Sequence, residues 1–261
     1  MLELKNKDVI HTMPSKKKKI HLLTLLALAS LFLTACAKPS PHSLVKKAQQ
    51  SKIANFQLKI DEHYYTGNKP VRFYGQINYQ RSPFVMQADL TQSGDQNVKM
   101  WVGQRYAYVK YYKDQQEAWY KAKLSQFTTI SHFQQLVKDM DTLTLSQKSA
   151  KLFSVSRTKN GWRLSYTGKS QRLWQEITET NGLASLSSDS QMAKAKLQQI
   201  KMTIDFSQKK QLTGLAIYAK YKVKGQTSST KLSMLKVNQQ KKLAIPKTVS
   251  KNSVDVSRLN K

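Results

Sequence analysis

The chain of 261 residues has one cysteine, Cys36, so it forms no internal disulfide and no cysteine-based zinc cluster. None of the common catalytic motifs is present: HExxH, GxSxG, the phosphate-binding loop or GxGxxG. Beyond residue 35 the only histidines are His42, His63 and His132, and their spacing does not match that of metal ligands. We therefore expect no catalytic residue, no metal and no cofactor, and a protein that is not an enzyme.

Acidic residues are also scarce. The chain has 15 Asp and Glu against 44 Lys and Arg, a formal charge of +29. Such a surface attracts polyanions, among them wall polymers and anionic lipid headgroups. Most of the charge comes from lysine, which lacks the planar fork that binds phosphate bidentately. We interpret the charge as diffuse attraction, without specific nucleic-acid recognition.

Only one long apolar run exists. It covers 20–35 and follows the positive run Lys16–Lys19. A spanning helix needs about 20 residues, so this shorter run behind positive charge indicates a signal peptide. Residues 1–12 do not fit a signal, and Met13 is a plausible true start.

The run ends in Leu33-Thr34-Ala35-Cys36, which resembles a bacterial lipobox. The resemblance implies cleavage between Ala35 and Cys36 and acylation of Cys36, for example with palmitate. It places the protein on the extracellular face of the cell membrane, anchored by lipid. An ordinary secretory signal with an incidental cysteine, or an uncleaved anchor, is the alternative.

After the signal peptide (1–35), we expect a tether (36–42), one β domain (43–250) and a polar tail (251–261). The domain opens with a helix capped by Ser43, and then apolar residues alternate with polar ones as in antiparallel strands. Two further helices are predicted, over 131–140 and 170–180, and Lys159-Asn160-Gly161 predicts a hairpin turn. The alternating rows include 56–60, 71–79, 84–90, 98–102, 105–112, 200–206 and 215–223.

This order of elements resembles bacterial lipoproteins of the LolA/LppX-like superfamily, in particular its uncharacterised Gram-positive families. The resemblance is carried by 43–48, 118–121, 161–164, 204–206 and 245–249. It implies an α+β, mainly β fold: a curved, incompletely closed antiparallel sheet, or half-barrel, with helices on the concave side. It also implies a cavity that carries lipid or acyl chains.

We therefore predict a cell-surface binding protein that holds an acyl chain or another apolar ligand in the half-barrel. Methionine is flexible and suits such a pocket, although it also fills gaps in ordinary cores. The residues predicted for the apolar ligand face are Met86, Met100, Trp162, Met202 and Met234. The alternative is an interaction lipoprotein with a packed core, whose basic surface binds anionic wall polymers or envelope partners.

Aromatic and basic residues interleave between 106 and 121. This pattern is typical of a sheet face made of good strand formers. Contact with the membrane surface is the second interpretation. The residues are Tyr106, Tyr108, Lys110, Tyr111, Tyr112, Lys113, Trp119, Tyr120 and Lys121.

Overall fold

The computed structural model describes residues 38–93, 96–111, 118–126, 144–180 and 192–256. The chain divides into two units, Met1–Pro39 and Ser40–Lys261. All described helices and strands belong to the second unit. The predicted signal peptide, Cys36 and the predicted helix over 131–140 lie outside the described residues.

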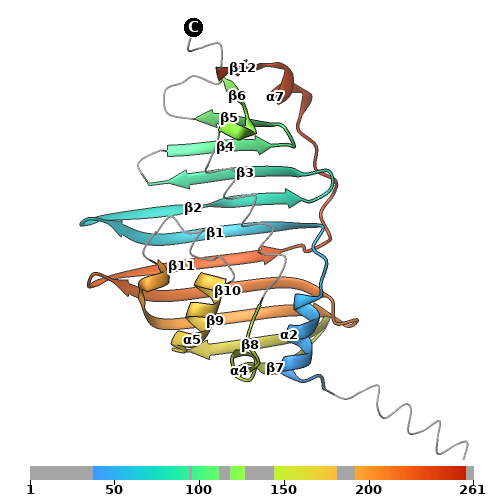
Figure 1. Ribbon diagram of the computed structural model, residues 1–261, viewed down its shortest axis with the longest axis vertical. Helices are drawn as coiled ribbons and strands as arrows, with labels where there is room; N and C mark the ends of the chain where they lie inside the picture. The colour runs from blue at the N-terminus through green and yellow to red at the C-terminus, as the bar shows by residue number, and fades with distance from the viewer. Residues whose placement is uncertain (1–37, 94–95, 112–117, 127–143, 181–191, 257–261) are drawn as a thin grey trace, which may run out of the picture. The chain divides into compact units, whose positions relative to one another are not determined.

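Twelve strands form one sheet in the order β12-β6-β5-β4-β3-β2-β1-β11-β10-β9-β8-β7 (Figure 1). Every pair of neighbours is antiparallel except β12 and β6, which are parallel. The strands are β1 (Asn55–Thr66), β2 (Lys69–Gln80), β3 (Val85–Gln92), β4 (Gln96–Val102), β5 (Tyr106–Tyr111), β6 (Trp119–Lys123), β7 (Ser154–Thr158), β8 (Gly161–Gly168), β9 (Lys196–Ser207), β10 (Leu212–Val223), β11 (Gln226–Leu235) and β12 (Ser253–Asp255).

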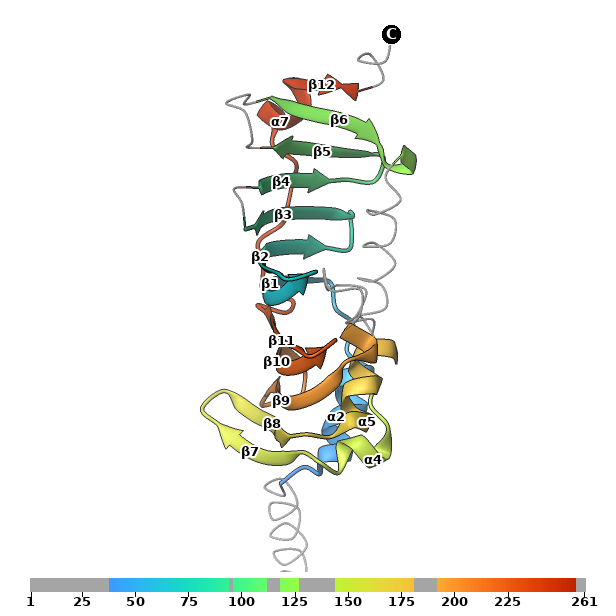
Figure 2. The same ribbon diagram turned by 90° about the vertical axis from the view of Figure 1, so that its left-hand side faces the viewer.

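The helices in the described part of the chain are short and few. They are α2 (Pro41–Gln49), α4 (Gln147–Ala150), α5 (Gln171–Gln175) and α7 (Lys247–Lys251), with one π-turn, η2 (Glu176–Thr180), and two 3₁₀ turns, η1 (Leu124–Gln126) and η3 (Met192–Lys194). Figure 2 shows α2, α4 and α5 on one face of the sheet, over its β7–β10 end. We call this the inner face and the opposite one the outer face.

The predicted fold class is confirmed: the sheet is curved and does not close, because β12 and β7 remain as its two edges. Two meanders along the chain meet at β1 and β11, which pair from Gln57 with Leu235 to His63 with Ser229. The first strand of the domain therefore lies beside its last long strand (Figure 1).

Turn chemistry agrees with this topology. The β10–β11 hairpin turns through Lys224 and Gly225, both at positive φ (48° and 87°). This is the conformation that tight antiparallel hairpins need. The predicted turn before Gly161 also joins two paired strands, β7 and β8.

Two details differ from the sequence predictions. The first helix begins at Pro41, and its cap is Ser40, whose Oγ accepts from the Ser43 backbone N–H at 3.2 Å. Proline at the first helical position has no N–H that would need a partner there, so the helix starts before Ser43.

At the other end the domain extends past residue 250, because Ser253–Asp255 pairs with β6. Three residues are too few to show a period in the sequence.

Candidate functional site

The strand register places one row of apolar side chains after another on the inner face. In the middle of the sheet Leu58 on β1 lies opposite Ile77 on β2 and Met234 on β11. The same parity continues to β4 through Ala88 and Met100. Alternation puts every second side chain on one face, so an apolar row crosses the inner face from β11 to β4.

The β7–β10 part of this surface is packed. Trp174 on α5 is fully buried, and its ring centroid lies 5.4 Å from that of Tyr221 on β10. Leu173 on α5 and Leu44 on α2 are buried in the same core. Each helix buries large side chains against strands, which leaves the inner face closed there.

The β2–β5 part is more open. In Figure 2 none of the described helices lies over β2, β3 and β4 on the inner face. Apolar side chains there keep partial exposure, and Tyr111 on β5 is 54% exposed. We call the half-buried members the open apolar strip: Val71, Phe73, Leu90, Val98 and Met100.

Register brings these side chains together. Val98 lies opposite Leu90 on β3 and Tyr111 on β5. Leu90 in turn lies opposite Gly75, whose lack of a side chain allows β3 close to β2: a Cβ on Gly75 would lie 2.2 Å from the Asp89 carbonyl oxygen. A continuous apolar surface thus spans three strands beside a glycine.

The five residues predicted for the ligand face lie on the inner face but not in one place. Met86, Met202 and Met234 are buried in the core. Trp162 is half-buried near the β7 edge, with the Arg157 guanidinium 5.4 Å from its ring. Met100 alone belongs to the open apolar strip. The other strip members come from predicted strands, and only the pairing register shows that they adjoin.

A buried carboxylate borders the strip. Glu62 on β1 is 1% exposed and lies opposite Phe73, on the inner face. The Thr230 hydroxyl donates to Glu62 Oε1 at 3.1 Å. Burial of a charged group is costly unless it is hydrogen-bonded. The inner face therefore carries a polar site next to its apolar one, and sequence alternation alone gave no sign of it.

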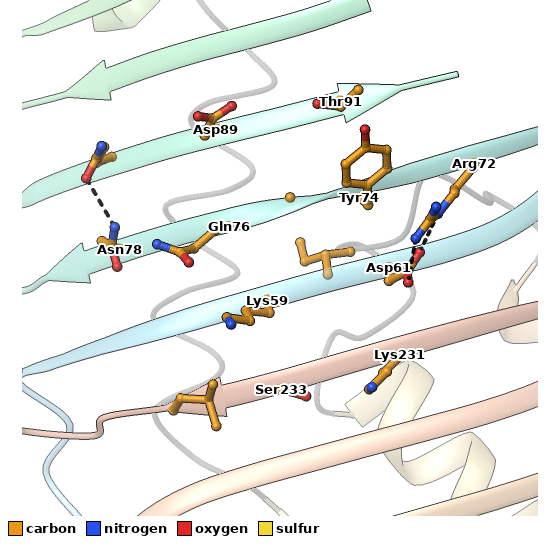
Figure 3. A pocket seen from close by; sticks show the side chains of 14 residues that line it. Lys59, Asp61, Arg72, Tyr74, Gln76, Asn78, Asp89, Thr91, Lys231 and Ser233 are labelled. Atoms are coloured by element: carbon orange, nitrogen blue, oxygen red, sulfur yellow. Dashed lines mark hydrogen bonds and ion pairs between the residues drawn. The ribbon is translucent and has the colours of Figure 1, made fainter. Parts of the chain in front are cut away.

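The outer face holds a polar groove of about 640 Å³ over β11, β1, β2 and β3 (Figure 3). In it the Arg72 guanidinium donates twice to the Asp61 carboxylate, at 3.0 and 3.1 Å. These hydrogen bonds hold the pKa of Asp61 below its usual value. A ladder of amides crosses the groove, from Gln57 through Asn78 to Gln87, at 3.2 and 3.1 Å.

The aromatic and basic residues between 106 and 121 divide between the two faces. Tyr106 and Tyr108 lie on the outer face, where Lys121 Nζ is 4.2 Å from the Tyr106 ring centroid. Tyr111 and Tyr120 lie on the inner face. Burial raises the pKa of Tyr108, and neighbouring Tyr106 adds to the shift. The described residues of this segment therefore lie on both faces of the sheet and do not form one membrane-facing surface. Tyr112 and Lys113 lie outside the described residues.

No group of three metal-ligating side chains occurs within the described ranges. His63 Nε2 lies 3.5 Å from Asp61, and that carboxylate is already bound to Arg72. His42 is exposed on α2, and His132 is outside the described ranges. Nor does any helix in the described part of the chain have the length and apolarity to cross a membrane.

Neither a protein-family model nor a curated protein matches the sequence. The solved structures to which the chain is similar include a lipoprotein and a LolA superfamily protein. The lipoprotein LppX of Mycobacterium tuberculosis is 12% identical, with a TM-score of 0.39 over 77% of this chain and 98% of LppX. A LolA superfamily protein of Nitrosomonas europaea is 10% identical, with a TM-score of 0.27 over 81% of this chain and 97% of the other. Likenesses this distant say nothing about what the chain binds.

Proposed function

We propose that this protein is a lipid-anchored binding protein of the cell surface that holds an acyl chain, or another apolar ligand, against the open apolar strip. The observation that carries the proposal is the half-buried apolar row from Phe73 to Met100 on the inner face, on strands that the described helices leave uncovered. Contiguous apolar surface of this kind typically marks a site of binding.

The energetics favour an acyl chain as the occupant. A linear chain can follow the strip across β2, β3 and β4, because Leu90 lies opposite Val98 and is the diagonal neighbour of Phe73, whose direct partner is Gln92. Each methylene group removed from water gains about 0.8 kcal/mol, so ten of them gain about 8 kcal/mol before ordering costs. Met100 adds a flexible contact that adapts to chains of different shape.

The proposed anchor is Cys36, acylated after cleavage behind Ala35. The positive run, the apolar run and the four-residue box before it occur in the order of a lipoprotein signal. A single acyl chain gives only marginal membrane binding, whereas two or three chains hold a protein for long periods. With this anchor, the binding domain works at the extracellular face of the cell membrane.

We propose binding rather than catalysis. Two of the carboxylates that could act as acids or bases are engaged in structure: Asp61 with Arg72, and Asp205 with Arg163 at 2.6 and 2.9 Å. The alternative function, a packed protein that binds anionic wall polymers through its basic surface, predicts an inner face that never takes up lipid.

Native mass spectrometry of the mature protein, released by detergent from membranes of its own host, tests the ligand. We expect a non-covalent lipid in addition to the covalent acyl groups. Phe73→Asn with Met100→Gln should remove that lipid because both changes put polar atoms on the strip. Tyr74→Asn, on the outer face, is the matched control and should keep it. A wild-type protein with no bound lipid would reject the proposal.

Incorporation of labelled palmitate tests the anchor separately. Wild-type protein should take up label and stay with the membrane fraction. Cys36→Ser should lose both, because serine has no thiol to acylate. If the Cys36→Ser protein remained equally attached to membranes, the anchor would lie elsewhere in the chain.

A further inference from the structure

Besides the groove on the outer face, a pocket of about 720 Å³ lies at the end of the sheet where β9 and β11 end and β10 begins. It forms where the end of α2, the β9–β10 turn and the segment after β11 meet. Four lysines from two of these three segments line it, and we call it the strand-end lysine pocket: Lys47, Lys52, Lys209 and Lys210.

The segments that line the pocket carry no acidic residue to balance this charge. The three contributing segments, 44–55, 206–213 and 235–247, contain neither Asp nor Glu. Within the described part of the chain, no carboxylate forms an ion pair with any of the four lysines. This differs from the outer face of the sheet, where Arg72 and Arg163 each bind a carboxylate. A concave site with uncompensated positive charge attracts anions.

Hydrogen bonds fix two sides of the pocket. Asn238, at a φ of 58°, accepts from the Ala54 backbone N–H at 2.6 Å and donates to the Lys52 carbonyl oxygen at 2.9 Å. In the β9–β10 turn, the Lys210 backbone N–H donates to the Ser207 carbonyl oxygen at 2.9 Å. The backbone that carries the lysines is thus held in place before any ligand binds.

We infer that the strand-end lysine pocket binds the phosphate groups of anionic phospholipid headgroups. The inference rests on the proposed anchoring, because Cys36 is only four residues before Ser40. Four residues span at most about 14 Å, and the nine-residue α2 is about 13 Å long. A tether this short allows a bilayer that holds Cys36 to approach α2, which carries Lys47 in its last turn. Clusters of four or more basic residues close to a membrane are typical of anionic-lipid binding.

Amide hydrogen exchange of the acylated, full mature protein in nanodiscs tests this inference. One set of discs contains only phosphatidylcholine, and the other contains phosphatidylglycerol in addition. We expect slower exchange in 44–55, 206–213 and 236–240 on the phosphatidylglycerol discs, and the difference should vanish at high salt. Each lysine near an anionic surface should strengthen that binding by roughly fivefold.

A quadruple variant removes the charge: Lys47→Gln, Lys52→Gln, Lys209→Gln and Lys210→Asn. Asparagine is chosen at 210 because that residue has a φ of 59°, which asparagine tolerates. The control replaces four exposed lysines of β9 and β10 by glutamine: Lys196, Lys201, Lys220 and Lys222. The pocket variant should lose the added protection, and the control should keep it.

Two results would overturn the inference. One is equal exchange on both kinds of disc. The other is protection of the three segments by soluble poly(glycerol phosphate) on phosphatidylcholine discs but not by phosphatidylglycerol, which would assign the pocket to a wall polymer. Retention of the protein on phosphatidylcholine discs reports the acyl anchor alone, so failure of the anchor and failure of the pocket are distinguishable.

Discussion

The two halves of the sheet use the same strand pattern in different ways. On β8–β10 the inner side chains meet α2 and α5, and residues such as Leu164 and Met202 are fully buried. On β2–β4 the same alternation leaves Phe73, Leu90 and Met100 half-buried. Both halves alternate apolar and polar residues equally well, so alternation identifies a face but not what covers it.

The difference separates stability from binding. Side chains in the packed half are covered by other parts of the chain, and their burial stabilises the fold. Side chains in the open apolar strip gain less from folding and remain able to contact a ligand. Substitutions in the two halves should therefore have different effects on stability and on lipid binding.

The largest effect is expected in the packed half. Trp174→Ala should lower the free energy of unfolding by about 3–5 kcal/mol, because the ring is fully buried against Tyr221. Phe73→Ala in the open strip should cost only about 1 kcal/mol, yet it should reduce lipid binding. Chemical denaturation and native mass spectrometry of both variants measure the contrast. Equal costs would remove the distinction between the halves.

Gly75→Ala should have an intermediate effect, at the inner face of the open half. A Cβ there would lie 2.2 Å from the Asp89 carbonyl oxygen and 2.9 Å from the Leu90 Cα. The strands β2 and β3 must then separate, at a cost of about 1–3 kcal/mol. Gly67→Ala, where a Cβ meets open space but φ is 61°, is the control for backbone strain alone. Thermal unfolding that ranks Gly75→Ala as neutral would contradict the close approach of the two strands.

The smallest effect concerns the outer face, where the halves are alike. Asp61–Arg72 in the open half and Asp205–Arg163 in the packed half are both two-bond pairs between neighbouring strands. The pKa of Asp61 in the folded protein lies below the ordinary value of 3.8. Its contribution to stability is therefore present above that pH and is lost as the pH falls through the folded pKa.

Because the pair is substantially exposed and screened by solvent, we expect that contribution to be small. Arg72→Gln should remove it, so the variant and the wild type should differ at pH 6 and converge in acid. Urea unfolding at several pH values measures this dependence. A difference that grew as the pH fell would have the wrong sign for this pair.

The sequence predicted much of the fold because its strands alternate and its turns are marked. The rows around Leu58, Ile77 and Ile204 became β1, β2 and β9, and Asn160-Gly161 marked a real hairpin. The pairing of β1 with β11 was not predictable, since it joins strands about 170 residues apart and depends on the whole sheet.

The site was harder to predict for the same reason. The predicted ligand face was based mainly on methionines and therefore included Met86, Met202 and Met234, which are core residues. It did not include Phe73 and Leu90. Exposure on the inner face depends on where helices pack, which composition does not encode. Nor did any local pattern mark the buried Glu62, whose partner Thr230 comes from a strand far along the chain.

Mapping the attachment sites of a photoactivatable fatty acid on the mature protein is a direct test of whether the open apolar strip binds lipid. We expect adducts in peptides that contain Phe73, Leu90 and Met100, and their loss when unlabelled fatty acid competes. Adducts spread over β8–β10, or no saturable labelling at all, would contradict a lipid site on the open apolar strip.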